Sequence, residues 1–172
     1  MRLFIAIPLA KDIAKIVWNV QEDLRGAGAS GDFVPRGNHH ITLRFLGDSD
    51  DLVDIAAAMR SAVRDAKPFT LRVGEVSGFA RGSTETTYLS VTDKSDELRR
   101  LHDTLETALR EAGFARGGRF APHITLGRRV LRGEAAMPEI APTAFRVNSI
   151  VLFESRRVGD RMTYTAVHTE GF

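Results

Sequence analysis

Apolar and polar residues follow two periodicities along the chain, and each predicts a different element. Residues 2–8 form a short apolar run closed by Pro8, which is typical of a buried strand. The stretch behind Asp12, a possible helix cap, carries apolar residues at helical spacing: Ile13, Ile16, Val17, Val20 and Leu24. The glycine-rich segment 26–31 ends this predicted helix.

The same two patterns alternate through the rest of the chain. Strands are predicted over residues 40–46, 69–73, 88–91, 123–127, 145–153 and 162–168, and helices over residues 52–63 and 98–109. Caps are expected among residues 48–50 for the first of these helices and near Ser95 or Asp96 for the second. Because helices and strands are interspersed, the pattern predicts an α+β protein.

Composition narrows the class of protein. A chain of 172 residues with 43% hydrophobic content can bury one substantial core, so we expect residues 1–172 to form a single domain. The net charge of +2 predicts no wide basic face, and the absence of Cys excludes disulfides and thiolate chemistry. The apolar run near the N-terminus is too short for a membrane span or signal peptide. We therefore expect a cytoplasmic protein, and a monomer is the expected oligomeric state.

One internal repeat carries the candidate chemistry. The tetrapeptide His-Ile-Thr-Leu at residues 40–43 recurs letter for letter at residues 123–126. Each copy lies on a predicted strand that follows an amphipathic helix and a glycine-rich link. We expect two related lobes packed about an approximate two-fold axis, with the two strands side by side and His40 facing His123.

Strand alternation separates each tetrapeptide into a polar and an apolar face. His40 and Thr42 point to one face roughly 7 Å apart, while Ile41 and Leu43 point to the other. The second copy repeats this arrangement, so two imidazoles and two hydroxyls would line one cleft. In-line displacement at phosphorus uses a proton acceptor and a proton donor on opposite sides, and two histidines can supply both without a metal.

Several segments beyond the repeat carry a resemblance to a known family. They are residues 1–7, 40–47, 122–128 and 152–156. Together with the two histidine motifs, they resemble the two-histidine (2H) phosphoesterase superfamily, and within it the LigT-type RNA 2',3'-cyclic phosphodiesterases. This resemblance implies a two-lobed fold with antiparallel sheets, helices on the outside and a cleft between the lobes.

The resemblance also implies residue roles and a substrate. It makes His40 the proton donor to the leaving ribose 3'-oxygen and His123 the proton acceptor from water, with Thr42, Thr125 and Arg128 binding phosphate. The implied substrates are RNA ends with a 2',3'-cyclic phosphate, or small cyclic nucleotides, and the product carries a 2'-phosphate. Reversible 2',5'-ligation of RNA ends is a further implied activity. No cofactor and no metal are implied.

Two other functions remain open. Two histidines can begin the site of a metal-dependent phosphohydrolase, although neither tetrapeptide contains a carboxylate. A noncatalytic module that binds RNA ends is the second, and would need aromatic platforms and a basic face.

The remaining candidates are expected outside the site. Phe45 shares its parity with Ile41 and is predicted to pack in the core rather than stack on a base. His39 should point away from His40 as a partly exposed neighbour. His102 is expected at the boundary of its helix, and His168 in a peripheral terminal strand.

Overall fold

The computed structural model describes all residues from Met1 to Phe172 and consists of three helices and nine strands. The helices are α1 (Lys11–Gly26), α2 (Leu52–Val63) and α3 (Glu97–Glu111). The strands are β1 (Arg2–Pro8), β2 (Ser30–Phe33), β3 (His40–Asp48), β4 (Phe69–Arg81), β5 (Thr84–Thr92), β6 (His123–Leu131), β7 (Thr143–Val147), β8 (Ser149–Val158) and β9 (Arg161–Gly171). The predicted α+β class is confirmed.

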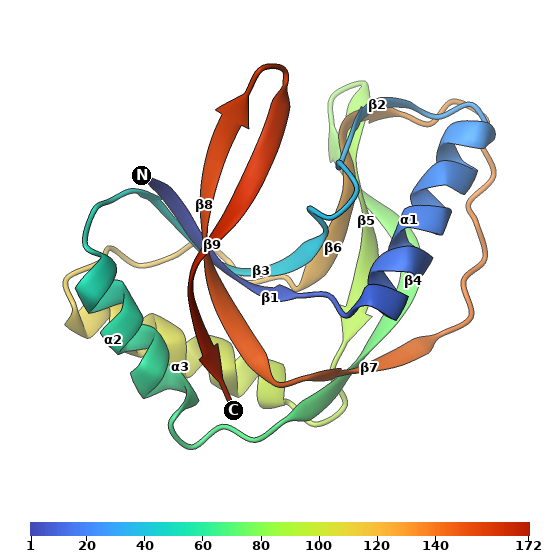
Figure 1. Cartoon of the computed structure of the whole chain (residues 1–172). Coiled ribbons are helices and arrows are strands. Elements are labelled where there is room, and N and C mark those ends of the chain that lie inside the picture. The colour runs from blue at the N-terminus through green and yellow to red at the C-terminus, as the bar shows by residue number, and fades with distance from the viewer.

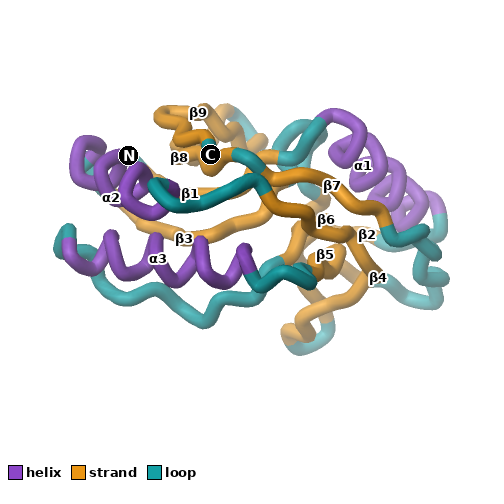
Figure 2. The backbone as a smooth tube through the Cα atoms, turned by 90° about the horizontal axis from the view of Figure 1, so that it is seen from below, coloured by secondary structure: helices purple, strands orange, loops and turns teal.

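All nine strands belong to one antiparallel sheet. Its order is β7-β4-β5-β6-β3-β1-β8-β9, with β2 paired to β6. The sheet is strongly curled, so the β8–β9 and β4–β5 hairpins rise on either side of β3 and β6 (Figure 1). Helix α1 lies beside the half that contains β4 to β6, and α2 and α3 lie beside the half that contains β1, β3, β8 and β9 (Figures 1 and 2).

The two repeat strands meet at the centre of this sheet. β3 pairs with β6 in antiparallel orientation, and Ile41 is the partner of Ile124. These residues occupy the same position in the two tetrapeptides, and both are fully buried. Antiparallel pairing of equivalent residues is the arrangement that a two-fold axis between the strands produces. The predicted adjacency of the two copies is therefore confirmed.

The helices pack as their periodicity predicts, but they begin differently. Asp12 was expected as a cap, whereas it lies inside α1, whose N-cap Ala10 makes no side-chain hydrogen bond. Likewise, the N-cap of α2 is Asp51 and not one of residues 48–50. At α3, the carboxylate of Asp93 accepts the backbone N–H of Leu98 at 2.7 Å. The N-cap of α3 is Asp96, as predicted, but its own side chain makes no capping hydrogen bond, and the Asp93 carboxylate supplies that contact instead.

Two strands depart from the predicted pattern. The single strand expected over residues 145–153 is interrupted at Asn148. β7 pairs with β4 at one edge of the sheet, whereas β8 pairs with β1 near the other, so the chain changes partners there. β2 was not predicted, because Ser30–Phe33 is short, mostly polar and lies in the glycine-rich link.

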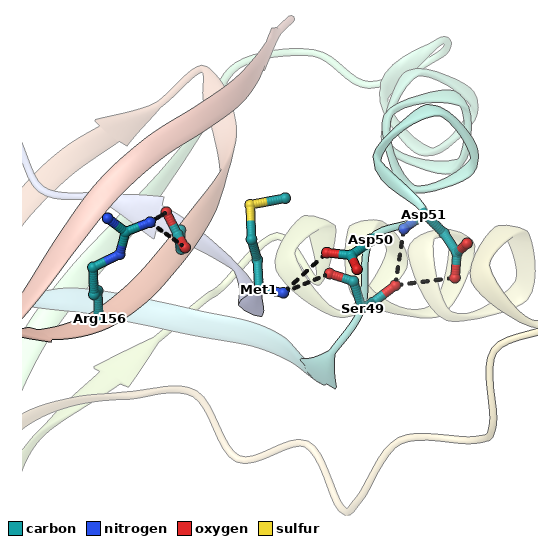
Figure 3. A network of polar contacts seen from close by, with 6 residues as sticks. Met1, Ser49, Asp50, Asp51 and Arg156 are labelled. Carbon is teal, nitrogen blue, oxygen red and sulfur yellow. Dashed lines mark hydrogen bonds and ion pairs between the residues drawn. The ribbon is translucent and has the colours of Figure 1, made fainter.

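The amino terminus is held in place by polar contacts (Figure 3). The Met1 ammonium donates to the Ser49 carbonyl and to Asp50 Oδ1, both at 3.1 Å. These contacts join the start of β1 to the segment between β3 and α2, next to the paired strands that carry the first motif. None of the three helices has the length and apolar character that a membrane span requires.

Candidate active site

The two repeat histidines are oriented in the same way by the backbone. The Nδ1 atom of His40 lies 2.7 Å from the carbonyl oxygen of Asn38, and that of His123 lies 2.6 Å from the carbonyl oxygen of Ala121. A carbonyl can only accept, so each Nδ1 carries the hydrogen. In both neutral rings this leaves Nε2 as the nitrogen that can exchange a proton with a substrate.

His40 lies in an apolar and aromatic setting. Its ring centroid is 4.9 Å from that of Phe4 and 5.4 Å from that of Tyr164, and Phe153 follows at 6.5 Å. Burial lowers the pKa of His40, and the positive charges of Arg128 and His123 lower it further, against the opposing effect of the hydrogen bond to Asn38. The free protein therefore favours neutral His40.

His123 also lies next to two aromatic side chains. Its ring centroid lies 5.4 Å from that of Phe79 and 5.3 Å from that of Tyr88. These two residues belong to the β4–β5 hairpin and stack on each other at 4.3 Å. Each catalytic candidate thus contacts one Phe and one Tyr from a hairpin, Phe153 and Tyr164 for His40 and Phe79 and Tyr88 for His123.

The two threonines follow the histidines on the same strands. Thr42 Oγ1 lies 3.0 Å from His40 Nε2, where it can donate to the neutral ring. Thr125 is half-buried, as His123 is, and alternates with the buried Ile124 and Leu126. Both hydroxyls therefore lie on the polar face of their strand.

Arg128 reaches the site through an irregularity of β6. Strict alternation would place it on the core face with Leu126, which is buried. However, register shifts interrupt the pairing of β6 with β5, and Arg129 adopts a left-handed backbone with φ 51°. Arg128 is consequently exposed, and its charge acts on His40. Only the resemblance had suggested this residue.

Phe45 was predicted in the core, and that prediction is wrong. Its side chain is 61% exposed, and its ring lies 6.0 Å from that of Phe4. The register of β1 against β3 shifts twice, once between Phe45 and Gly47 and once between Arg44 and Thr42. These shifts interrupt the alternation that the prediction assumed.

The expected exposure of His39 is also wrong, since it is 7% exposed. It packs toward α1, where its Nε2 lies 2.9 Å from Gln21 Oε1, and Gln21 Nε2 donates to the Val34 carbonyl at 3.0 Å. Desolvation, with a smaller contribution from the charge of His40, lowers the pKa of His39 to about 4. His39 is therefore a neutral structural residue behind the site.

The other two histidines have partners of their own. His102 stacks on Phe120 at 4.0 Å, at the boundary of α3 as predicted. His168 lies 2.7 Å from Glu170 in β9.

A cavity of 270 Å³ adjoins the candidate site and is lined in part by Asn38, His40, Phe153 and Tyr164. A larger cavity of 780 Å³ lies between α2, α3 and the start of β4, and includes neither histidine of the repeat. Because the candidate proton transfers use the repeat histidines, the smaller cavity, which His40 lines, is the better candidate. No three His, Asp or Glu side chains are grouped closely enough to hold a metal ion.

The chain matches one protein family and is similar to several named proteins and solved structures. Residues 12–159 match the 2'-5' RNA ligase superfamily. The RNA 2',3'-cyclic phosphodiesterase of Thermotoga maritima is 32% identical over 130 residues, which cover 74% of this chain and 70% of that protein. The protein of the same name from Geobacillus stearothermophilus is 28% identical over 162 residues. These residues cover 88% of this chain but only 51% of the Geobacillus protein. The crystal structure of E. coli LigT in apo form superposes with a TM-score of 0.76 at 27% identity, covering 99% of this chain and 96% of that one.

Proposed function

The chain belongs to the 2'-5' RNA ligase superfamily, and we propose that it is an enzyme that opens 2',3'-cyclic phosphates at RNA ends to leave 2'-phosphates. The observation that supports this most is the pair of histidines whose Nδ1 atoms are both held by backbone carbonyls. Their free Nε2 atoms suit proton transfer on opposite sides of a phosphate. The names of the Thermotoga and Geobacillus relatives support the same reaction.

The reaction requires one proton to enter and one to leave. His123 Nε2 takes a proton from water while the water oxygen bonds to phosphorus. The bond from phosphorus to the ribose 3'-oxygen breaks, and that oxygen takes a proton from His40 Nε2. Thr42, Thr125 and Arg128 bind the nonbridging oxygens, where charge-assisted hydrogen bonds are strongest. Proton exchange with solvent restores both rings.

A donor must be protonated, and this requirement bears on His40. Its pKa is lowered in the free protein, which works against the charged form. An anionic phosphate next to His40 favours the charged form of that ring and raises its pKa. Substrate binding would therefore help to protonate the donor. Because the two motifs are alike in sequence and in backbone contacts, the donor and acceptor assignments follow the family resemblance.

The donor set suits acid–base chemistry better than metal catalysis. A catalytic zinc usually takes three protein ligands, whereas this site offers two imidazoles and hydroxyl groups. The same geometry could also support 2',5'-ligation, with a ribose 5'-hydroxyl in place of water. E. coli LigT has been crystallised with 3'-AMP, which is consistent with a nucleotide-sized site. Monomeric state, cytoplasmic location and two repeat lobes in one domain remain predictions.

One experiment separates this proposal from the alternatives. Purified protein is incubated, with chelator, with an oligonucleotide that ends in a 2',3'-cyclic phosphate, and the product isomer is identified. We expect a 2'-phosphate at the same rate with and without chelator. Loss of activity that zinc restores would indicate a metal-dependent hydrolase. Binding without turnover would indicate a noncatalytic module.

A further inference from the structure

The hairpin beside His40 carries an unpaired cation on its inner face. In β8 and β9, Ser155 pairs with Tyr164 and Arg157 pairs with Met162, with no register shift from Phe153 to the tip. Phe153 and Tyr164 both contact the His40 ring, so the face they share is the inner one. Alternation places Arg157 on that face, two residues or roughly 7 Å beyond Ser155.

The hairpin beside His123 carries an equivalent residue. Phe79 pairs with Thr86 and Arg81 pairs with Thr84 at the tip of β4 and β5. Phe79 contacts the His123 ring, so alternation places Arg81 on the face of this hairpin that is turned to the site. On each hairpin, the aromatic side chains next to the histidine are thus followed toward the tip by one arginine on the same face.

Neither of these arginines is engaged within the protein. Both are exposed, and no carboxylate lies within ion-pair distance of either guanidinium. Arg156 provides the contrast, because it alternates to the other face and pairs with Glu154 at 3.0 Å. A free guanidinium at the edge of a phosphate site is suited to a second phosphate.

We propose that Arg157 binds the internucleotide phosphate on the 5' side of the terminal nucleotide, which makes oligonucleotide ends better substrates than cyclic mononucleotides. This inference rests on the proposed function, in which the leaving 3'-oxygen lies at His40. The terminal ribose then lies beside Phe153 and Tyr164, and the RNA chain continues along the β8–β9 hairpin toward Arg157. Arg81 lies on the side from which water enters and has no RNA phosphate to bind.

The test removes one charge from the protein and, separately, one charge from the RNA linkage. The substrates are a dinucleotide ending in a 2',3'-cyclic phosphate and the same dinucleotide with an uncharged methylphosphonate linkage. The proteins are the wild type, Arg157→Gln and the matched control Arg81→Gln. We expect Arg157→Gln to lower kcat/KM for the charged dinucleotide about tenfold, mainly through KM, because the contact does not change during the reaction.

The uncharged linkage makes the result specific to this contact. Wild type should lose about tenfold on it, and Arg157→Gln should lose nothing further, as expected for two groups that interact only with each other. The salt dependence of KM for the charged dinucleotide should weaken by a slope of about 0.7 in Arg157→Gln. Arg81→Gln should behave as wild type on both substrates.

Two results would overturn the inference while the proposed function stands. Equal loss on both linkages, or no loss, would show that Arg157 does not bind this phosphate. Loss in Arg81→Gln instead would place the RNA chain along the β4–β5 hairpin. If wild type opens neither dinucleotide, the proposed function itself fails.

Discussion

The two halves of the site share a motif but not its surroundings. Both histidines receive the same backbone contact from the residue two positions earlier. On the first half, His40 is desolvated, its pKa is lowered, and the buried pair of His39 and Gln21 lies behind it. On the second half, Pro122 stands in place of His39, and the aromatic rings next to His123 are Phe79 and Tyr88 of the β4–β5 hairpin.

This difference in surroundings bears on how two histidines with the same backbone geometry can act as a proton donor and a proton acceptor. Two identical groups in identical settings would have the same pKa, and neither would be favoured as donor or acceptor. Burial lowers the pKa of His40 and by itself favours the neutral ring, so the proposed donor role of His40 depends on the charge of the bound phosphate. The asymmetry therefore lies in what surrounds the motifs, and the following variants test how far it extends.

Removing either ring tests what the halves share. We expect His40→Ala and His123→Ala each to lower turnover by roughly two to four orders of magnitude, the usual contribution of a positioned acid or base. Turnover on an oligonucleotide with a 2',3'-cyclic phosphate measures this, with circular dichroism as the control for folding. Near-normal turnover in either folded variant would rule out the two-histidine mechanism.

The pH dependence of the same variants tests how the halves differ. Wild type should give a bell-shaped profile of kcat/KM, with each limb changing about tenfold per pH unit. The acidic limb should disappear in His123→Ala, because the acceptor must be neutral, and the alkaline limb in His40→Ala, because the donor must be charged. The opposite pattern would exchange the two roles. A flat wild-type profile would contradict the mechanism.

His39 provides a test of the buried pair that only the first half possesses. Its pKa is about 4 in the folded protein and near 6.5 when unfolded, so the unfolded state binds more protons between these values. This contribution to stability is complete above pH 6.5 and falls by about 3 kcal/mol as the pH drops toward 4. Urea unfolding from pH 4 to 7.5 should show a shallower decline in His39→Gln than in wild type. Equal slopes would show that His39 is not held neutral.

Arg128 belongs to the second half of the site, but its positive charge lowers the pKa of His40 in the first half. Replacement by Lys retains the charge but not the two-pronged contact, so we expect kcat/KM to fall about tenfold. Arg129→Lys is the matched control, because that neighbouring side chain pairs with Asp32. Full activity of Arg128→Lys would show that its geometry is unimportant for phosphate binding.

The smallest effect concerns Phe45, which follows the first motif. Because its side chain is largely exposed, Phe45→Ser should change the free energy of unfolding by no more than about 0.5 kcal/mol. Leu43→Ala, at a buried position of the same strand, should cost about 2–5 kcal/mol. Chemical denaturation measures both. A decrease of more than about 2 kcal/mol in the free energy of unfolding of Phe45→Ser would show that the Phe45 side chain is packed in the core.

Local pattern was sufficient for much of this molecule and insufficient where strands meet. The bounds of β1 and the pairing of the two tetrapeptides could be predicted, because a buried strand and an exact repeat are visible in one chain. The exposure of Phe45 and the position of Arg128 could not. Both depend on bulges, which arise from the fit between a strand and its partner and not from the strand alone.

The pairing of Ile41 with Ile124 has a consequence for how such a site can change. Two separate copies of a shorter chain could form the same contact across an isologous dimer interface, where every substitution would appear twice. In one continuous chain each half can be altered alone. Arg44 follows the first motif and pairs with Glu106 at 2.9 Å. The equivalent residue is Gly127, where an added Cβ would meet Val130 at 2.8 Å. Covalent continuity therefore permits the two halves to specialise without losing their common axis.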